Sequence, residues 1–379
     1  MDQSKKGIVA VIVIVVVLVV GYFVSKGPSE PVSTGPIKIG FIAPLTGDAA
    51  TYGEMARNLV QLVIKEINAS GEVKNPIEII YEDGKCSGKD AINAMQKLVN
   101  VDKVKVVLGG FCSSESLAVV HIANENKVLL VSAGSSSPDL TAISKYFVRN
   151  YPSDATQGSV LAKIAIEKGW KKVAFIQEQL DYPLGIYKAF SAEFEKRGGI
   201  VIKEEFPTTV TDVRSQLTKL RAEKSDALFI DTQTPASGER VLKQVKDLKW
   251  KIPLLVSDAV VGDVQVVKNN AVAMEGALAA EFGVDPNNLQ FKGMLEKYQK
   301  EYGVEIPFQS YAQTYYDAVF MIKDALVAVD NDVEKMAEWF RVVKDWSGAS
   351  GLTTIGDDGD RDGGHTPKII KNGKVELYK

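Results

Sequence analysis

Residues 37–71 read IKIGFIAPLTGDAATYGEMARNLVQLVIKEINASG and contain one complete strand–loop–helix unit. The segment 37–43 is apolar and rich in β-branched residues, which is typical of a buried strand, and it ends at Pro44. Gly71 is suited to the left-handed position that ends a helix. Between them, apolar residues recur at helical spacing through 49–69, at Met55, Leu59, Leu62, Val63 and Ile67. The stretch therefore predicts a strand followed by the helix that covers it.

The same alternation continues along the chain. Further strands are predicted at 77–81, 104–108 and 128–131, and the pattern restarts after residue 150 with strands at 173–176, 200–203, 227–230 and 254–256. Helical patterns fall between them, for example at 91–99, 117–123, 182–196 and 214–224. Strands that are apolar along their length and separated by helices indicate parallel sheets covered on both faces. We therefore predict an α/β fold of two doubly wound, Rossmann-like lobes.

Composition and charge argue against several classes of protein. The chain has 379 residues, and its 45 basic and 48 acidic residues leave a net charge of −3. It lacks the basic surplus that phosphate binding requires, so we predict no nucleic-acid partner. The two histidines, His121 and His365, and the two cysteines show no metal-ligand spacing, which argues against a zinc site. No nucleophile–base pair or cofactor fingerprint is visible, so we predict neither an enzyme nor a cofactor, although a Ser–His–Asp site could still be built from the few histidines.

The N-terminus carries a candidate membrane segment. Residues 7–24 contain no charged or strongly polar side chain, and such a run is just long enough to cross a bilayer core as a helix. Lys5 and Lys6 precede this run and Lys26 follows it, which favours a cytoplasmic N-terminus with the body of the protein outside. We assign residues 1–26 to a cytoplasmic stub and transmembrane anchor, and the Pro-, Gly- and Ser-rich residues 27–36 to a linker.

A cleaved signal peptide is the alternative for this segment. Its closest cleavage context is Ser-Lys-Gly at 25–27, and Pro28 follows it, which makes the context a poor one. No cysteine follows the apolar run, which excludes lipid attachment to a mature N-terminal cysteine. With either reading the body is exported, and we expect a single-pass cell-membrane protein with an extracytoplasmic body.

Three loops at the predicted carboxyl ends of first-lobe strands share one chemistry. They read PLTGD at 44–48, GGFCSS at 109–114 and SAGSSSP at 132–138. Ligands of open parallel sheets bind beyond the carboxyl ends of the strands, where hydroxyls and helix N-terminal amides can hold a carboxylate. The alternative is that these serines and threonines only cap helices. Because several such loops converge on one cleft, the sequence favours a ligand site between the lobes.

Several motifs together resemble one known family. They are IKIGFIAPLTGDAATYGE at 37–54, INASG at 67–71, YEDGKCSGKDA at 81–91, VLGGFCSSES at 107–116 and SAGSSSPDLT at 132–141. Over residues 37–379 the chain resembles type I periplasmic binding proteins of the leucine/isoleucine/valine-binding class, the substrate-binding components of branched-chain amino-acid ABC importers. The resemblance implies two lobes joined by a hinge, with lobe 1 at 37–152 plus 282–351 and lobe 2 at 153–281 plus 352–379.

The resemblance also implies the polar contacts of a ligand site. Ser113 matches the serine that hydrogen-bonds the ligand carboxylate, and Gly134 and Ser136 match a pair that grips the α-amino and α-carboxylate groups. Asp258 matches an acidic residue that pairs with the ligand ammonium, where a glutamate is common. Gly134 stands in place of a more usual alanine. A helix cap is the alternative role for Asp258.

Aromatic residues complete the implied site. Tyr52 and Tyr311 match wall residues, and Tyr182 matches an aromatic residue of the second lobe; Tyr52 could instead be a core residue. The second-lobe loop 232–235 (TQTP) lacks an aromatic that related chains carry there. This departure leaves the branched-chain specificity open and allows a more polar ligand.

The resemblance places a disulfide between Cys86 and Cys112, which suits an exported protein; two free thiols are the alternative. The acidic run 357–362 lacks the spacing of a calcium-binding EF-hand loop and predicts a polar turn. The implied function is extracytoplasmic binding of an amino acid, branched-chain or similar, by lobe closure, for delivery to a membrane ABC permease. The alternative is a receptor module that senses amides or other small carboxylates and passes the signal to a partner protein.

Overall fold

The computed structural model describes residues 35–379. Residues 37–379 form one compact unit that contains every helix and strand among the described residues. The predicted transmembrane segment at 7–24 lies outside the described residues, as does nearly all of the predicted linker at 27–36. Among residues 35–379, no helix is both long and apolar enough to cross a bilayer.

The first sheet has five parallel strands in the order β2-β1-β3-β4-β5. The strands are β1 (Ile37–Ala43), β2 (Ile77–Asp83), β3 (Val106–Leu108), β4 (Leu129–Ser132) and β5 (Phe147–Arg149). The predicted strands at 37–43, 77–81, 104–108 and 128–131 are confirmed, with ends that shift by up to two residues. Strand β5 was not predicted, because three residues are too few to show a period.

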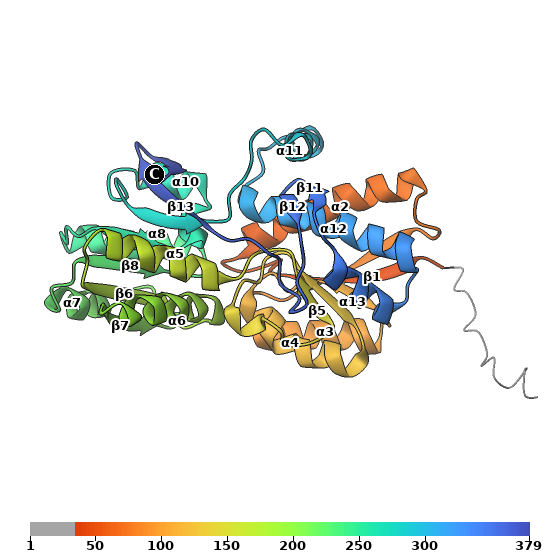
Figure 1. Ribbon diagram of the computed structural model, residues 1–379, viewed down its shortest axis with the longest axis horizontal. Coiled ribbons are helices and arrows are strands. Elements are labelled where there is room, and N and C mark those ends of the chain that lie inside the picture. Colours follow the sequence, from red (N-terminus) through yellow and green to blue (C-terminus); the bar gives the residue numbers. More distant parts are fainter. Residues whose placement is uncertain (1–34) are drawn as a thin grey trace, which may run out of the picture. The chain divides into compact units, whose positions relative to one another are not determined.

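Helices cover both faces of this sheet (Figure 1). They are α2 (Ala50–Ser70), α3 (Gly88–Asn100), α4 (Ser113–Asn126), α11 (Leu289–Tyr302), α12 (Gln309–Val329) and α13 (Val333–Val342). Neighbouring residues of β1 show how: Phe41 packs into the core shared with α2 and α12, and Ile42 packs into the core shared with α3 and α4. Side chains alternate across a strand, so a strand buried on both faces needs a continuous apolar run.

The second sheet has seven strands in the order β14-β13-β10-β9-β8-β6-β7. The strands are β6 (Lys172–Glu178), β7 (Ile200–Phe206), β8 (Ala227–Asp231), β9 (Leu254–Val256), β10 (Leu278–Glu281), β13 (Thr366–Lys371) and β14 (Lys374–Leu377). The first five are parallel; four of them, β6 to β9, were predicted, whereas β10 was not, and β13 and β14 are antiparallel. The prediction of a wholly parallel sheet was therefore incomplete. The missed signal is Asn372-Gly373, both with positive φ, which form the tight turn of a β-hairpin.

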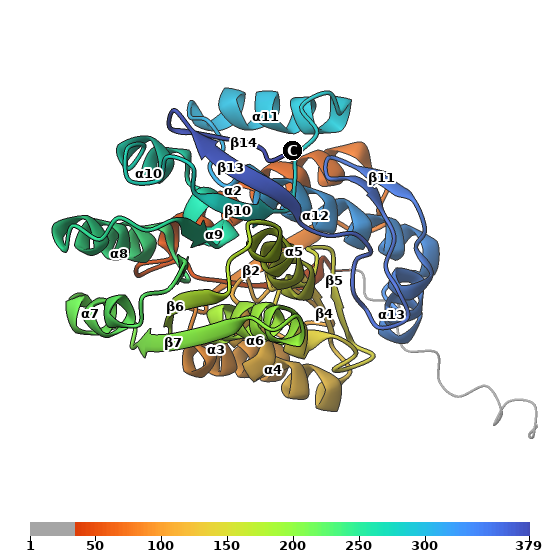
Figure 2. The ribbon, with the colours of Figure 1, turned by 60° about the vertical axis from the view of Figure 1, so that its left-hand side comes forward.

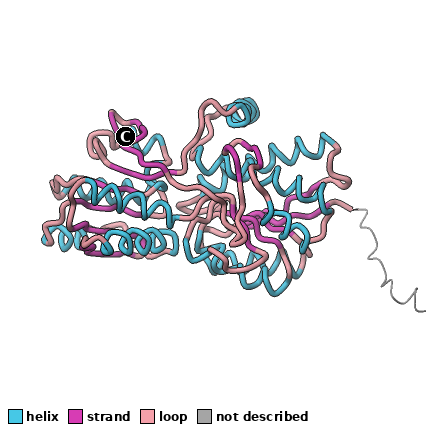
Figure 3. Tube along the Cα trace, viewed as in Figure 1, coloured by secondary structure: helices cyan, strands magenta, loops and turns pink. Residues whose placement is uncertain are grey.

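The second sheet is also covered on both faces, by α5 (Asp154–Glu167) and α6 (Asp181–Lys196) on one face and by α7 (Arg214–Ala222), α8 (Pro235–Asp247) and α10 (Val264–Asn269) on the other. Figure 2 shows α5 lying beside α6, and Figure 3 shows the helices on the outside of the strands. The two-lobe α/β architecture predicted from the alternation is thereby confirmed.

Three connections carry the chain between the two sheets. They run from β5 to β6, from β10 to the helices α11 and α12, and from the small hairpin β11 (Trp346–Gly348)–β12 (Gly351–Thr353) to β13. The third connection contains the acidic run 357–362, which forms the predicted polar turn, with Gly356 N–H donating to the Asp360 carbonyl. The residue limits of the two lobes stay a prediction.

Candidate ligand-binding site between the two sheets

The serine-rich loops of the first sheet hold one another through buried hydroxyls. Ser132 Oγ and Ser135 Oγ donate to the carbonyl of Gly110 at 2.9 and 3.0 Å. Ser113 Oγ accepts the backbone N–H groups of Ser136 and Ser137 at 3.3 and 3.1 Å. Most of these hydroxyls thus tie the loops after β3 and β4 together and do more than cap helices.

Two of the predicted hydroxyls keep a donor for a ligand. Ser136 is buried, and its Oγ has no hydrogen-bond partner among residues 35–379. The Ser113 hydroxyl only accepts in the contacts of the described residues, so its own proton is available. Gly134 lies between the two loops, and a Cβ at this position would come within 2.9 Å of the Phe111 carbonyl oxygen. The loop geometry therefore favours glycine at this position over a residue that carries a Cβ.

Asp258 joins side chains of both sheets. It is the first residue of the short helix α9 (Asp258–Val261), and it is 1% exposed. Its carboxylate accepts the hydroxyl of Tyr151 at 2.7 Å, that of Tyr311 at 3.1 Å, and that of Tyr182. Tyr151 follows β5 of the first sheet and Tyr182 begins α6 over the second sheet, so the carboxylate links the two lobes. The alternative role as a helix cap is wrong, because Ser257 holds the N-cap position.

Two predicted wall aromatics, Tyr52 and Tyr311, belong to one cluster of aromatic rings beside Asp258. Tyr151 and Tyr311 stack at 4.5 Å between ring centroids, and Tyr52 packs against Phe111 at 4.9 Å and against Phe308 at 4.3 Å. Burial, followed by the charge of Asp258, raises the pKa of Tyr52, Tyr151 and Tyr311 well above the ordinary value. The phenols therefore stay neutral, and those of Tyr151 and Tyr311 donate to Asp258.

Sequence reasoning missed Asp154, Tyr151 and His365. His365 Nε2 lies 3.7 Å from Asp154 Oδ1 and 3.9 Å from Asp258 Oδ2, and all three side chains are buried. Burial lowers the pKa of His365 to about 4, so the ring is neutral at pH 7. The only sequence signal for Asp154 is an acidic residue in the first turn of a helix, which is common for a helix start. His365 lies in an irregular segment, and no pattern singles it out.

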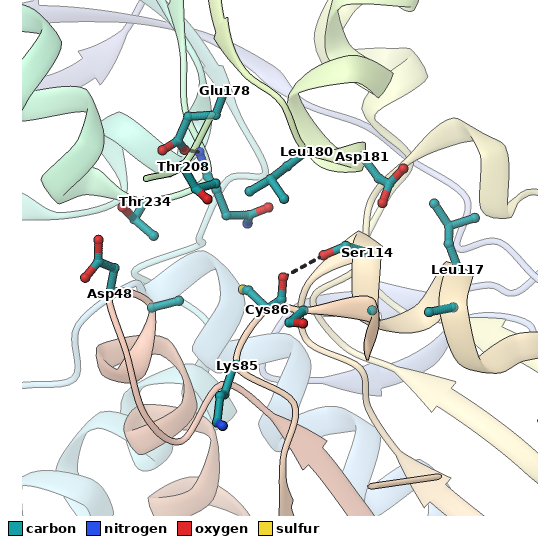
Figure 4. Close-up of a pocket in the computed structure, with 15 residues that line it drawn as sticks. Asp48, Lys85, Cys86, Ser114, Leu117, Glu178, Leu180, Asp181, Thr208 and Thr234 are labelled. Atoms are coloured by element: carbon teal, nitrogen blue, oxygen red, sulfur yellow. Dashed lines mark hydrogen bonds between the residues drawn. The ribbon is translucent and has the colours of Figure 1, made fainter. Parts of the chain in front are cut away.

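A cavity of about 760 Å³ opens beside this cluster, between loops of the two sheets (Figure 4). Its first-sheet wall includes Asp48, Lys85 and Ser114, and its second-sheet wall includes Glu178 and Thr234. None of the seven predicted ligand residues lines it, because the tyrosines and Asp258 fill their own space. The predicted residues are nonetheless brought together: Asp154 N–H donates to the Ser136 carbonyl at 2.8 Å and so joins the serine loops to the Asp258 cluster.

The predicted disulfide between Cys86 and Cys112 is confirmed, with Cα atoms 5.2 Å apart. The buried carboxylate of Glu115 accepts the backbone N–H groups of both cysteines, at 3.0 and 2.9 Å. Burial raises the pKa of Glu115 to about 7. The bridge and this carboxylate together fix the start of α4, where Ser113 lies.

Two α/β lobes that meet around buried polar side chains at the carboxyl ends of their strands define a two-lobe ligand-binding protein. The chain belongs to the periplasmic binding protein family, whose sequence model matches residues 36–366. It is 26% identical over 339 residues to the Leu/Ile/Val-binding protein BraC3 of Rhizobium johnstonii, covering 87% of this chain and 90% of that protein. It is 27% identical to a leucine-, isoleucine-, valine-, threonine- and alanine-binding protein of Pseudomonas aeruginosa, covering 83% and 84%.

Solved structures agree with these relatives. A leucine-binding protein LivK from Thermotoga maritima superposes with a TM-score of 0.82 and 28% identity, covering 90% of this chain and 98% of that one. The branched-chain amino-acid binding protein LivJ from Streptococcus pneumoniae, in complex with isoleucine, gives a TM-score of 0.79 and 26% identity over 90% and 98%. These comparisons confirm the predicted resemblance of this chain to leucine/isoleucine/valine-binding proteins of the periplasmic binding protein family.

Proposed function

We propose that this protein is the extracytoplasmic substrate-binding component of an ABC importer and that it closes on one amino acid. The observation that supports the proposal is that two kinds of group lie in one cluster. The first sheet supplies hydroxyls that are free to donate, and the second sheet supplies a buried carboxylate. Ser113 and Ser136 can donate to an α-carboxylate, and Asp258 can accept from an α-ammonium.

We expect lobe closure because the serine hydroxyls belong to the first sheet and the Asp258 carboxylate belongs to the second. A zwitterion that contacts Ser136 on one side and Asp258 on the other makes both contacts only when the lobes are together, so binding favours the closed state. The phenols of Tyr151 and Tyr311 already reach Asp258 across the sheets and supply the same kind of contact. The closed form is the one that a membrane permease would recognise, and an anchor at residues 7–24 would keep the protein close to it.

Isothermal titration with leucine, isoleucine, valine, threonine, alanine, simple amides and small carboxylates tests the proposal. We expect an amino acid to bind with a stoichiometry of one. Ser136→Ala should lower its affinity by roughly 1.5–3 kcal/mol, the contribution of one hydrogen bond to a charged group. Ser191→Ala is the matched control, because the Ser191 hydroxyl only donates within its own helix α6. Binding of amides or carboxylates alone, with no amino acid bound, would refute the assignment of Asp258 to an ammonium.

A further inference from the structure

The second sheet presents a row of carboxylates to the cleft. Four neighbouring strands, in the spatial order β10-β9-β8-β6, each reach an acidic residue at or just after the carboxyl end: Glu281, Asp258, Asp231 and Glu178. Neighbouring strands lie roughly 4.8 Å apart, so the row crosses the cleft in steps of about that size. Asp231, Asp258 and Glu178 are at most 3% exposed. The corresponding loops of the first sheet supply hydroxyls instead.

The cations of the protein do not pair with this row. Among residues 35–379, none of the four acids, nor the adjoining Asp154, lies within 4.0 Å of a lysine or arginine nitrogen. The buried Arg149 is bound to Asp360 instead, and Arg240 approaches Asp48 at 3.8 Å. Buried carboxylates are normally paired with a cation, because desolvation of an unpaired charge is costly. The row therefore has more carboxyl groups than nearby cations to pair with them, and a bound cation would favour their ionised form.

Several atoms of the row also lack a hydrogen-bond donor. Both carboxylate oxygens of Asp231, which is fully buried, and Oδ2 of Asp154 have no partner among the described residues. Burial, followed by the charge of Asp154, raises the pKa of Asp231 well above its ordinary value. The neighbouring acids Asp154, Asp258 and Glu178 each raise the pKa of Asp231. The nearby Ser257 hydroxyl acts in the opposite direction and lowers that pKa.

His365 adds an acceptor to the same space. Its Nδ1 lies 2.7 Å from Thr156 Oγ1, and that hydroxyl donates its proton to the Ser153 carbonyl at 2.9 Å. When the Thr156 hydroxyl donates to Ser153, Nδ1 carries the ring proton and donates to Thr156, and Nε2 then faces Asp154 and Asp258 as an acceptor. The His365 ring and the carboxyl groups of Asp154 and Asp258 thus face one another in a buried space, an arrangement that a cation can complete.

We infer that the amino acid received at this site carries a second positive charge on its side chain, as lysine, ornithine and arginine do. The inference rests on the proposed function, since Asp258 is still assigned to the α-ammonium. The side-chain cation would lie further along the row, at Asp231 and Glu178. Glu178 also lines the cavity of about 760 Å³, so a long polar side chain has room on this wall (Figure 4). The loop 232–235, which carries no aromatic residue, supplies polar groups there.

Isothermal titration of the unmodified protein with L-lysine, L-ornithine, L-arginine, L-leucine and zinc chloride tests the inference. We expect a basic amino acid to bind at least 100-fold more tightly than leucine. Its binding at pH 6.5 should release protons, detected as a heat that depends on the ionisation enthalpy of the buffer, because the cation ionises the acids around Asp231. Leucine should release fewer protons.

Two variants of one strand supply a matched pair. Asp231→Asn, at the carboxyl end of β8, should weaken lysine binding at least 10-fold and change leucine binding less than 3-fold. Asp226→Asn, just before the amino end of β8, should leave both affinities unchanged, since Asp226 only accepts backbone N–H groups at the far edge of the sheet. Equal losses for both ligands in Asp231→Asn would contradict the inference.

The outcomes separate the inference from the proposed function. If leucine binds as tightly as lysine, the inference of a second positive charge on the ligand is wrong, whereas the proposed amino-acid-binding function still holds. Failure of every amino acid to bind overturns both. If zinc binds saturably and no amino acid binds, Asp154, Asp258 and His365 form a metal site, and both the inference and the proposed function are wrong.

Discussion

Arg149 is the residue whose replacement tests the interior of this protein most directly. It ends strand β5 and is fully buried. Its Nε and Nη2 atoms donate to the two oxygens of Asp360, each at 2.7 Å, and its Nη1 donates to the Ser137 carbonyl at 2.8 Å. One side chain therefore connects the end of the first sheet, the polar turn between β12 and β13, and the serine loop of the candidate site.

Arg149→Met should lower the free energy of unfolding by about 3–5 kcal/mol, because it leaves the Asp360 carboxylate buried without its cation. Asp360→Leu alone should cost a similar amount. The double variant should cost less than the sum of the two, since no unpaired charge remains. The assay is urea unfolding followed by circular dichroism at pH 7.

Lys65→Met is the control for this series. Its ammonium pairs with Glu301 at 3.0 Å, but the lysine side chain is 71% exposed, so the loss should be at most about 1 kcal/mol. An Arg149→Met protein within about 1 kcal/mol of the unmodified protein, or strictly additive effects in the double variant, would refute the reasoning.

Three further predictions concern the scaffold of the site. Protonated Glu115 stabilises the fold below its ordinary pKa of 4.5, and this stabilisation is lost as the pH rises through its folded pKa of about 7. The free energy of unfolding should therefore fall between pH 5 and 8, and Glu115→Gln should make that fall smaller by about 3 kcal/mol. Replacing both Cys86 and Cys112, 26 residues apart, by alanine should cost about 3.5 kcal/mol in denaturant unfolding; no change would contradict the chain-entropy argument. Gly53→Ala should lower the melting temperature, because its Cβ would lie 2.0 Å from a loop carbonyl oxygen, whereas Gly293→Ala, with open space around it, should raise it slightly.

Much of the fold could be predicted from the sequence, because its signals are local. Strand runs such as 37–43 and helical spacing such as that of 49–69 depend on neighbours within a few turns, and both elements occur as predicted. The disulfide followed from the family resemblance. The antiparallel hairpin at the C-terminal end was missed, although Asn372-Gly373 marks it in the sequence.

The candidate site could be predicted only in part. Ser113, Ser136 and Asp258 were assigned through the resemblance, and their use by a ligand stays a prediction. Asp154 and His365 follow no pattern, since one lies in the first turn of a helix and the other in an irregular segment more than 200 residues away. Their approach depends on the connection that carries the chain from β12 back to β13.

By itself, the sequence determined the strand–helix alternation, the two-sheet architecture and the family, since periodicity and motifs are properties of short segments. Only the tertiary structure decided that the carboxyl groups at the ends of four strands stand side by side and that His365 turns Nε2 toward two buried acids. The reason is that sheet order is not chain order: β10, β9, β8 and β6 become neighbours through crossover connections, and unpaired charge is visible only once the surrounding cations have been placed.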